Sequence, residues 1–345
     1  MTHLHNEPIY VVVAMDFSDQ IIDELRSISP QLQIERHFPK VPDKVWEKAE
    51  VLYTSSIVPD PAQAPRLRWI QLNSAGVDHL ADHPVMKAED VIITSASGIH
   101  AVQISEYCLG MMLAFNYKIP TMLRYQARSE WRSRREDDES ELLYLPHELR
   151  GQTLGIAGYG SIGRELARMA RALGMKVLAT KRDLMNLHDD NGYREPGTGD
   201  PTGDIPDRLY PSEALGSMAR ECDFLVLTLP NTQSTRHCVN AEIFQQMKPN
   251  AVLINVGRGS VVDEDALIEA LRSKKIAGAA LDVFEEEPLP PTSPLWKLDN
   301  VIISPHISGL SVNYHRKAAA LFSENLRRYI DNRPLLNRVD RASGY

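Results

Sequence analysis

The chain has 345 residues, and its 38 lysines and arginines against 46 aspartates and glutamates give a formal net charge of −8. This length predicts two domains, and an acidic chain is a poor general binder of nucleic acid, because phosphate contacts require clustered Lys and Arg. No apolar run approaches the roughly 18–20 residues of a membrane span, and the polar start MTHLHNEP lacks a signal-peptide core. The three separated cysteines predict neither a disulfide framework nor a metal site, and they suit a reducing cytoplasm.

The first part of the chain predicts a parallel α/β arrangement. Short runs rich in Val, Ile and Leu alternate with stretches whose apolar residues recur at helical spacing, such as DQIIDELRSIS. Continuous apolar runs of this kind are typical of strands that are covered on both faces. The strands predicted here are 8–15, 49–55, 68–76 and 91–96.

A longer helical pattern covers residues 100–117 and is apolar on more than one face, which predicts a buried helix at a domain or subunit junction. The stretch after it is polar, and its segment 132–141, RSRREDDESE, mixes both signs of charge. Mixed signs favour a solvated loop or helix end over an interaction patch.

A second series of strands and helices begins after Gly151 and predicts a second α/β domain. The segment 183–212 departs from this series, because it is rich in Gly, Pro and Asp and has no apolar periodicity. We expect it to form a long surface excursion, with a mobile excursion favoured over a functional lid. The six strands predicted in this series are 153–158, 176–181, 223–230, 251–256, 278–283 and 301–305.

A glycine-rich turn, GYGSIG at 158–163, follows the first strand of this series and opens the predicted helix 164–173. Its spacing is that of the dinucleotide-binding fingerprint GxGxxG. The three glycines permit the tight turn, the approach of backbone to a pyrophosphate, and close packing of helix on strand. The N–H groups that open the helix would face the anion, aided by the helix dipole. The residues predicted to bind the cofactor at this turn are Gly158, Gly160, Ser161, Ile162 and Gly163.

The end of the next strand predicts which dinucleotide binds. Enzymes that use NAD usually carry an acid about 20 residues further on, where it holds the ribose 2′-hydroxyl. This chain has Lys181 and Arg182 there, ahead of Asp183. Two cations attract the 2′-phosphate of NADP, whereas an acid repels it. We therefore expect NADP(H) to be preferred over NAD(H).

Three later segments each place one reactive residue after a predicted strand: Arg258 in INVGRGSVVDEDAL, Glu287 in GAALDVFEEEP and His306 in VIISPHISG. The carboxyl ends of parallel strands meet at one edge of a sheet, so these loops can converge. An Arg can grip a carboxylate and polarise an adjacent carbonyl. A His exchanges protons near neutral pH, and a carboxylate can orient it. Together they predict a catalytic group.

The motifs GYGSIG, NVGRGSVVDEDAL, GAALDVFEEEP and SPHISG together resemble the D-isomer-specific 2-hydroxyacid dehydrogenase family, over about residues 73–328. The resemblance implies two Rossmann-like α/β domains with parallel sheets and an active site in the cleft between them. The substrate-binding domain would comprise residues 1–100, completed by 307–345 with a helix at 314–330, and the dinucleotide-binding domain would comprise residues 101–306. The resemblance also suggests a homodimer.

Roles for single residues follow from the resemblance. Arg258 would bind the substrate carboxylate and carbonyl, His306 would be the acid/base, and Glu287, which precedes a proline, would pair with His306. Glu285 and Glu286 are alternatives for this pairing by proximity. The further cofactor contacts that the resemblance implies are Asp282 and the backbone of Val256 at the nicotinamide carboxamide, and Pro230 beside the adenine.

The loop NSAGVD at 73–78 follows a predicted strand and resembles the family loop that receives the substrate carboxylate, here on the backbone N–H groups of Ala75 and Gly76. A glycine allows backbone to approach a ligand closely. A second loop predicted to lie near the substrate side chain carries Tyr53, Ser55 and Ser56.

The predicted reaction is hydride transfer between the nicotinamide and a small anionic 2-oxo or D-2-hydroxy acid such as glyoxylate or hydroxypyruvate, with His306 exchanging the proton. Alternatives within the enzyme class are bulkier 2-oxo acids and 3-phosphoglycerate. The roughly 40 residues after His306 leave no room for the added domain that phosphoglycerate dehydrogenases often carry. Formate dehydrogenases are disfavoured, because they pair the His with Gln. A nucleotide-sensing corepressor of the same fold is the alternative from another class.

Overall fold

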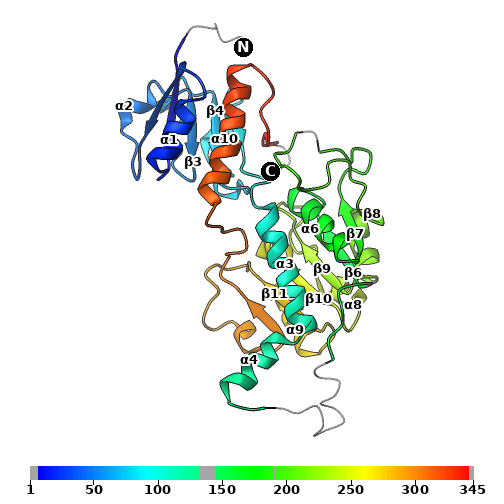
Figure 1. The fold of residues 1–345 in the computed structure, drawn as a ribbon. Coiled ribbons are helices and arrows are strands. Elements are labelled where there is room, and N and C mark those ends of the chain that lie inside the picture. The colour runs from blue at the N-terminus through cyan, green and yellow to red at the C-terminus, as the bar shows by residue number, and fades with distance from the viewer. Residues whose placement is uncertain (1–6, 132–144, 190, 342–345) are drawn as a thin grey trace. The chain divides into compact units, whose positions relative to one another are not determined.

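The computed structural model describes residues 7–131, 145–189 and 191–341. They form two compact α/β units, each built on a parallel sheet (Figure 1). The predicted fold class of two such domains is therefore confirmed. Unit 1 and unit 2 consist of the described residues within Met1–Ile99, Asp190–Glu195 and Ser311–Tyr345, and within His100–Asp189 and Pro196–Leu310, respectively.

Unit 1 contains a five-stranded sheet in the order β2-β1-β3-β4-β5, in which every neighbouring pair is parallel. Its strands are β1 Ile9–Ala14, β2 Leu32–Arg36, β3 Val51–Thr54, β4 Trp69–Leu72 and β5 Ile92–Thr94. Its helices are α1 Asp19–Arg26, α2 Asp43–Trp46 and α10 Tyr314–Ile330, with 3₁₀ turns at Pro61–Gln63, Asp78–Leu80 and Pro84–Lys87. The order is that of flavodoxin-like doubly wound sheets, and the winding reverses between β1 and β3.

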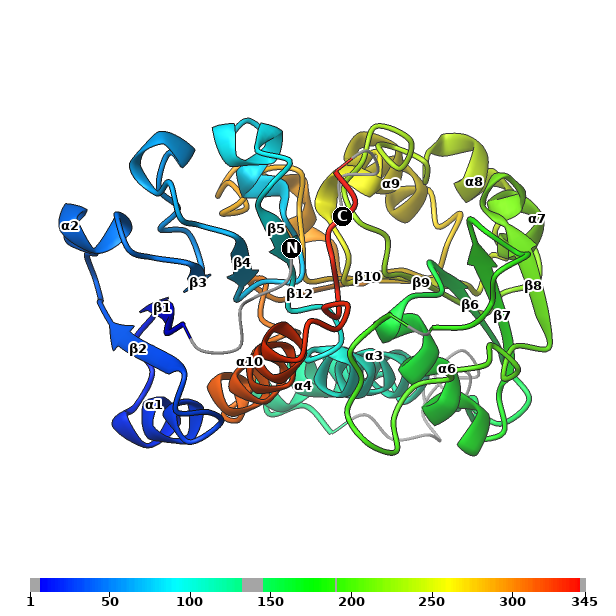
Figure 2. The same cartoon turned by 90° about the horizontal axis from the view of Figure 1, so that it is seen from above.

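Both faces of this sheet are covered, because crossovers between parallel strands run over its faces. Successive side chains of β1 point to opposite faces. Val11 and Val13 pack toward α1 and α10, whereas Val12 and Ala14 pack toward α2 and the 3₁₀ turns (Figure 2). The all-apolar sequence of β1 follows from this double burial.

Unit 2 contains a seven-stranded parallel sheet in the order β12-β11-β10-β9-β6-β7-β8. Its strands are β6 Thr153–Ala157, β7 Lys176–Lys181, β8 Arg208–Pro211, β9 Phe224–Leu227, β10 Val252–Asn255, β11 Gly278–Leu281 and β12 Val301–Ile303. Its helices are α3 Ala101–Asn116, α4 Ile119–Ala127, α6 Ser161–Ala172, α7 Leu215–Ala219, α8 Ala241–Gln246 and α9 Glu264–Arg272, with 3₁₀ turns at Ser212–Ala214, Gly259–Val261 and Pro294–Lys297. This is the Rossmann order extended by one strand, and the winding reverses between β6 and β9.

Two edge strands were not predicted. The side chains of β2 alternate between buried and exposed near its start, and its sequence LQIER carries too little apolar signal. β8 pairs with β7 inside the segment 183–212, for which no regular structure was predicted, so that prediction is wrong for Arg208–Pro211. An edge strand of four residues that buries only Tyr210 leaves no periodic pattern in the sequence.

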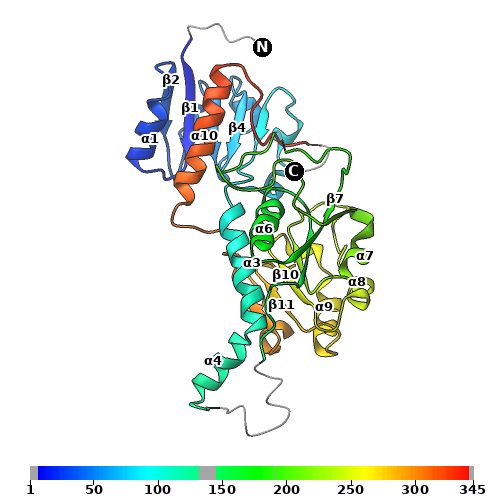
Figure 3. The same cartoon turned by 45° about the vertical axis from the view of Figure 1, so that its right-hand side comes forward.

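The remaining predicted elements are present with adjusted bounds. The helix predicted at 314–330 coincides with α10, and the helix predicted at 100–117 is α3, which α4 continues away from the sheet (Figure 3). The sequence placed the domain boundaries after residues 100 and 306, whereas unit 1 resumes at Ser311 and also takes part of the segment 183–212. The mixed-charge stretch 132–141 lies outside the described residues. Among the helices that the structure describes, none is both long and apolar enough to cross a membrane.

Candidate active site

The glycine-rich turn of unit 2 joins β6 to α6 at the point where the winding of the sheet reverses. Gly158 has a φ of +102°, a backbone conformation that favours glycine. Its N–H donates to Thr180 Oγ1 at 3.2 Å, and its carbonyl accepts from Thr228 Oγ1 at 2.7 Å. Hydroxyl groups at the ends of β7 and β9, the strands on either side of β6, therefore hold the turn in place.

The other two glycines of the turn fit a bound pyrophosphate in different ways. A Cβ atom on Gly163 would lie 2.4 Å from the carbonyl oxygen of Gly158, so only glycine lets α6 pack this closely on the turn. A Cβ atom on Gly160 would have no neighbour within 4 Å, which leaves room for a ligand against the backbone. Gly160 is also the N-cap of α6 and has no side-chain oxygen to accept from the helix N–H groups. The turn fits the phosphates of a dinucleotide.

The basic pair lies at the end of β7. Lys181 is the last residue of the strand and is half-buried, and Arg182 is exposed. Burial, followed by the neighbouring charge of Arg164, lowers the pKa of Lys181 from its ordinary value. The predicted adenine-side residue Pro230 is half-buried after β9, and Val256 is buried after β10, where its N–H donates to Leu227 O at 3.2 Å.

The segment after the basic pair is fastened to the glycine-rich turn. Tyr159, within the turn, donates its hydroxyl to Asp200 Oδ2 at 2.6 Å, and Arg164 donates to the carbonyl oxygens of Asp200 and Leu187. Although burial opposes it, the hydrogen bonds from Tyr159 and from three backbone N–H groups lower the pKa of Asp200 below its ordinary value. The three N–H groups belong to Gly203, Asp204 and Ile205. Asp200 is thus the centre of a buried polar cluster that was not predicted.

The predicted acid/base pair is in direct contact. His306 Nδ1 lies 2.7 Å from Glu287 Oε2, and the second oxygen of this carboxylate accepts from Phe284 N–H at 3.1 Å. A carboxylate can only accept, so Nδ1 carries the proton of this bond and Nε2 remains for a substrate. The His306 side chain is half-exposed at 52% and is accessible. Glu285, one of the alternatives for this pairing, bonds to His237 instead.

The loop that carries Arg258 packs against the loop that carries Glu287. A Cβ atom on Gly259 would lie 1.9 Å from the carbonyl carbon of Phe284, so the backbones are in contact there. Asn255 holds the Arg258 loop through two hydrogen bonds: its side chain donates to Arg258 O at 3.0 Å and accepts from Gly257 N–H at 3.1 Å. The structure therefore brings two of the three reactive loops together at the carboxyl edge of the sheet, and the hydrogen bond of His306 joins the third.

Asp282 is fully buried beneath the His306 loop. Its carboxylate accepts from Ser304 Oγ at 2.5 Å, from Ile307 N–H at 2.9 Å and from Ser308 N–H at 2.9 Å. A carboxylate offers about four acceptor positions, so these bonds leave one for the carboxamide contact that the sequence predicts.

In unit 1 the predicted carboxylate loop follows β4. Within the residues that the structure describes, the N–H groups of Ala75 and Gly76 donate no hydrogen bond, and the carbonyl of Gly76 accepts from Ser74 Oγ at 2.7 Å. Tyr53 is only 1% exposed, and its hydroxyl donates to Asn73 Oδ1 at 2.6 Å. The structure thus places Tyr53 as a support beneath this loop and not on its surface. The serines predicted beside it, Ser55 and Ser56, are exposed.

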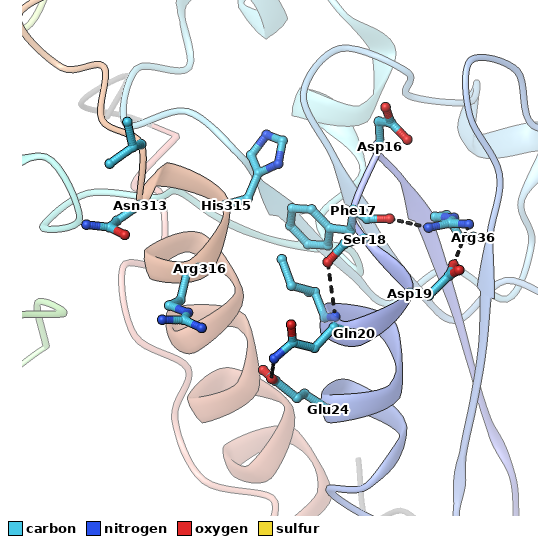
Figure 4. A pocket seen from close by; sticks show the side chains of 12 residues that line it. Asp16, Phe17, Ser18, Asp19, Gln20, Glu24, Arg36, Asn313, His315 and Arg316 are labelled. Carbon is cyan, nitrogen blue, oxygen red and sulfur yellow. Dashed lines mark hydrogen bonds and ion pairs between the residues drawn. The ribbon is translucent and has the colours of Figure 1, made fainter.

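A hollow of about 680 Å³ in unit 1 lies between the N-terminal ends of α1 and α10 (Figure 4). It contains none of the residues predicted for the active site. Several of its polar side chains are bonded to their neighbours: Ser18 accepts from a helix N–H, Arg36 pairs with Asp19, and Gln20 donates to Glu24 (Figure 4). The hollow is not assigned to the reaction.

Prediction missed residues that act through others. Thr180, Asn255 and Asp200 hold the loops on which the predicted residues stand. The bonds of Thr180 and Asp200 reach 22 and 41 residues along the chain, whereas that of Asn255 reaches only three. A hydroxyl or amide at a strand end was the only signal in the sequence, and such residues are common at strand ends.

The chain was compared with known proteins. The family described as "D-isomer specific 2-hydroxyacid dehydrogenase, NAD binding domain" matches residues 109–308. The glyoxylate reductase of Thermofilum pendens is 32% identical over 263 residues, which cover 76% of this chain and 72% of that relative.

Two solved structures are also similar. A D-isomer specific 2-hydroxyacid dehydrogenase from Xanthobacter autotrophicus Py2, in complex with NADPH and MES, is 29% identical at a TM-score of 0.79, covering 99% of this chain and 100% of that chain. An NADPH-dependent glyoxylate/hydroxypyruvate reductase from Sinorhizobium meliloti, in complex with NADP and sulfate, is 25% identical at a TM-score of 0.75, covering 98% and 100%.

Proposed function

We propose a substrate and a preferred cofactor for this chain, which belongs to the D-isomer specific 2-hydroxyacid dehydrogenase family and is an NAD(P)-dependent 2-hydroxyacid dehydrogenase. The proposed substrate is a small 2-oxo acid, with glyoxylate and hydroxypyruvate as the first candidates, and the proposed cofactor is NADPH in preference to NADH. The observation that carries the proposal is the bond of 2.7 Å between His306 Nδ1 and Glu287 Oε2. The loop that carries Glu287 packs against the loop that carries Arg258, so the three side chains belong to one site.

The side chains divide the reaction between them. The nicotinamide, when bound, supplies the hydride. Arg258 offers a planar guanidinium that can hold a carboxylate through two parallel bonds and polarise the adjacent carbonyl. His306 donates the proton at Nε2 to the carbonyl oxygen, and Glu287 stabilises the positive charge that the imidazole carries before this donation. Ala75 and Gly76 of unit 1 are proposed to donate their N–H groups to the substrate carboxylate.

Replacing His306 tests the catalytic assignment. His306 and His237 both have a positive φ and both contact a glutamate, so His306→Asn and His237→Asn form a matched pair of variants. Asn is chosen because it tolerates a positive φ. We expect His306→Asn to lower kcat by about 10²–10⁴-fold, the usual contribution of general acid–base catalysis, with NADPH binding retained. His237→Asn should keep its turnover. An unchanged kcat in His306→Asn would contradict the assignment.

The cofactor preference is supported by Lys181 and Arg182 at the end of β7 and by the NADPH and NADP that the two solved relatives hold. Steady-state kcat/KM for NADPH and NADH measures it directly. Lys181→Ala should lower the preference for NADPH by about tenfold, the order expected for losing one charge-assisted bond to phosphate. Lys176→Ala, at the other end of the same strand, is the control that should leave it unchanged. A wild-type protein that prefers NADH would refute the proposal.

The substrate class is tested by NADPH oxidation against a panel of 2-oxo acids. Turnover of glyoxylate or hydroxypyruvate above bulkier acids is expected. The nucleotide-sensing corepressor is not favoured, because the named relatives are enzymes. Tight nucleotide binding without turnover of any acid would reverse this judgement.

We also propose that the chain forms a homodimer through α4 and the end of α3. Five large apolar side chains are 40–57% exposed there, which is a concentration that unpartnered surfaces rarely carry. They are Leu113, Tyr117, Ile119, Met122 and Leu123. Light scattering should give a dimer for the wild type and a monomer for Leu123→Glu, and a monomeric wild type would contradict the proposal.

We further propose a cytoplasmic location and no nucleic-acid partner. The separated cysteines favour the first, and the net charge of −8 favours the second.

A further inference from the structure

The backbone of His306 adopts a conformation that requires support. Its φ is +54°, in the left-handed region, which is unfavourable for a residue with a Cβ atom. Such residues persist where the surrounding structure holds them, and they cluster at functional sites. The support for His306 is therefore part of how its imidazole is aimed.

Asp282 supplies this support from both its backbone and its side chain. Its carbonyl oxygen accepts from His306 N–H at 2.9 Å, and its carboxylate accepts from the next two N–H groups, those of Ile307 and Ser308. Three consecutive backbone donors thus end on one residue that is 0% exposed. Asp282 therefore holds the chain on both sides of the His306 Cα, through its carbonyl before it and its carboxylate after it.

Two hydroxyl groups in series hold that carboxylate. Ser304 Oγ donates its single proton to Asp282 Oδ1 at 2.5 Å, so in the contact of 2.7 Å between Ser304 Oγ and Tyr107 Oη the tyrosine must be the donor. Burial raises the pKa of Tyr107 to about 12, so the phenol keeps the proton that it donates at neutral pH. Bonds in such a series polarise and strengthen one another.

We propose that Tyr107 and Ser304 are positioning residues for the reaction, which act through Asp282 to hold His306 in its left-handed conformation. Tyr107 lies on α3 and Ser304 directly follows β12, so the network anchors the His306 loop to a long helix that packs on α6. The kinetic part of this proposal rests on the proposed function, in which His306 transfers the proton. The structural part does not depend on it.

Removal of either hydroxyl tests the proposal by kinetics. In Tyr107→Phe and in Ser304→Ala, kcat should fall by about 10-fold to 100-fold, the scale of a small displacement of a catalytic group. KM for NADPH should change by a smaller factor, because Asp282 provides only one of the predicted cofactor contacts. Because the two residues act in series, the double variant should lose little more than either single variant. Ser304→Thr keeps the hydroxyl and should recover most of the lost turnover.

Tyr210→Phe is the matched control. Tyr210→Phe also loses a partly buried phenol bond, to Glu221 at 2.5 Å, but Tyr210 lies on β8, at the opposite edge of the same sheet from β12. It should lose stability without losing kcat at saturating NADPH. If Tyr107→Phe behaves like Tyr210→Phe, with a lower Tm and an unchanged kcat, Tyr107 has a structural role only and the proposal is overturned.

A second measurement does not require activity. In protein labelled on histidine rings, the signals of His306, assigned by their loss in His306→Asn, should be single in the wild type and broadened or doubled in Tyr107→Phe. Identical His306 signals in the two proteins would overturn the positioning role. If the wild type turns over no 2-oxo acid but the His306 signals respond as expected, the proposed function fails and the positioning network stands.

Discussion

The two units differ most clearly at equivalent places, the turns that follow the first strand of each sheet at the point where the winding reverses. In unit 1 the turn after β1 leads into α1 through Ser18, whose Oγ accepts from Ile21 N–H at 3.4 Å (Figure 4). Asp19 adds a negative charge in the first turn of α1 and pairs with Arg36 at 2.8 Å. The positive end of α1 is thus served by the chain itself.

In unit 2 the turn after β6 leads into α6 through Gly160, which has no side chain, and the first turn of α6 contains no acid. Gly163 allows the closest approach of this helix to the turn. The positive end of α6 is therefore left for an external anion. The comparison shows that the helix after the first strand of a parallel sheet can be capped by the chain itself or left without a side-chain cap, where an anion can be received.

Among variants that test this contrast, the largest expected effect is on NADPH affinity, when the second turn is made to resemble the first. Gly160→Ser places a capping hydroxyl and a Cβ atom where the structure has open space, so the fold should be kept while the site is filled. We expect the Kd for NADPH, measured by fluorescence titration, to rise by about 100-fold, equivalent to ~2.7 kcal/mol. Gly110→Ala is the control, because its added methyl group also meets open space but lies on α3. Unchanged NADPH affinity in Gly160→Ser would show that the two turns do not differ in the way proposed.

A smaller effect, on the free energy of unfolding, is expected at the Asp200 cluster, which bonds to Tyr159 in the second turn. Because the pKa of Asp200 is lowered in the folded protein, its carboxylate stabilises the fold above the ordinary aspartate pKa, and this contribution is lost as the pH falls through the lowered value. Asp200→Asn should therefore cost about 1–3 kcal/mol at pH 7, where a charged acceptor is lost. Urea unfolding at pH 7 and near pH 3 measures this. A difference between wild type and variant that is as large near pH 3 as at pH 7 would contradict the assignment of this carboxylate.

The smallest expected effect is on the free energy of unfolding, when the cap in the first turn is removed. Ser18→Ala removes the cap of α1 and should lower the free energy of unfolding by about 1 kcal/mol, the usual value for a lost N-cap. NADPH affinity should stay at the wild-type value, because the proposed nucleotide site lies at α6 and not at α1. Weaker NADPH binding in Ser18→Ala at full folding would remove the contrast between the turns.

Most of the architecture could be predicted because its signals are local. Buried parallel strands such as β1 and β9 are continuous apolar runs, and α10 shows helical periodicity. The turn 158–163 is recognised by the spacing of its three glycines. The strand-end rule then predicts that Arg258, Glu287 and His306 lie at one edge of a sheet. The edge strand β8 was not predicted, since a strand of four residues that buries only Tyr210 carries no comparable pattern.

By itself, the sequence determined the fold class and the two-unit organisation, and it located the glycine-rich turn and the residue types of the candidate catalytic group, because each of these depends on neighbours along the chain. Tertiary structure decided which partner each reactive residue takes. It paired His306 with Glu287 and His237 with Glu285, and it joined Tyr107 to Ser304 across 197 positions. It also buried Tyr53 in β3, although the sequence predicted this residue on a loop beside the substrate. Such contacts bring together residues that share no periodicity, so only the packed chain can select them.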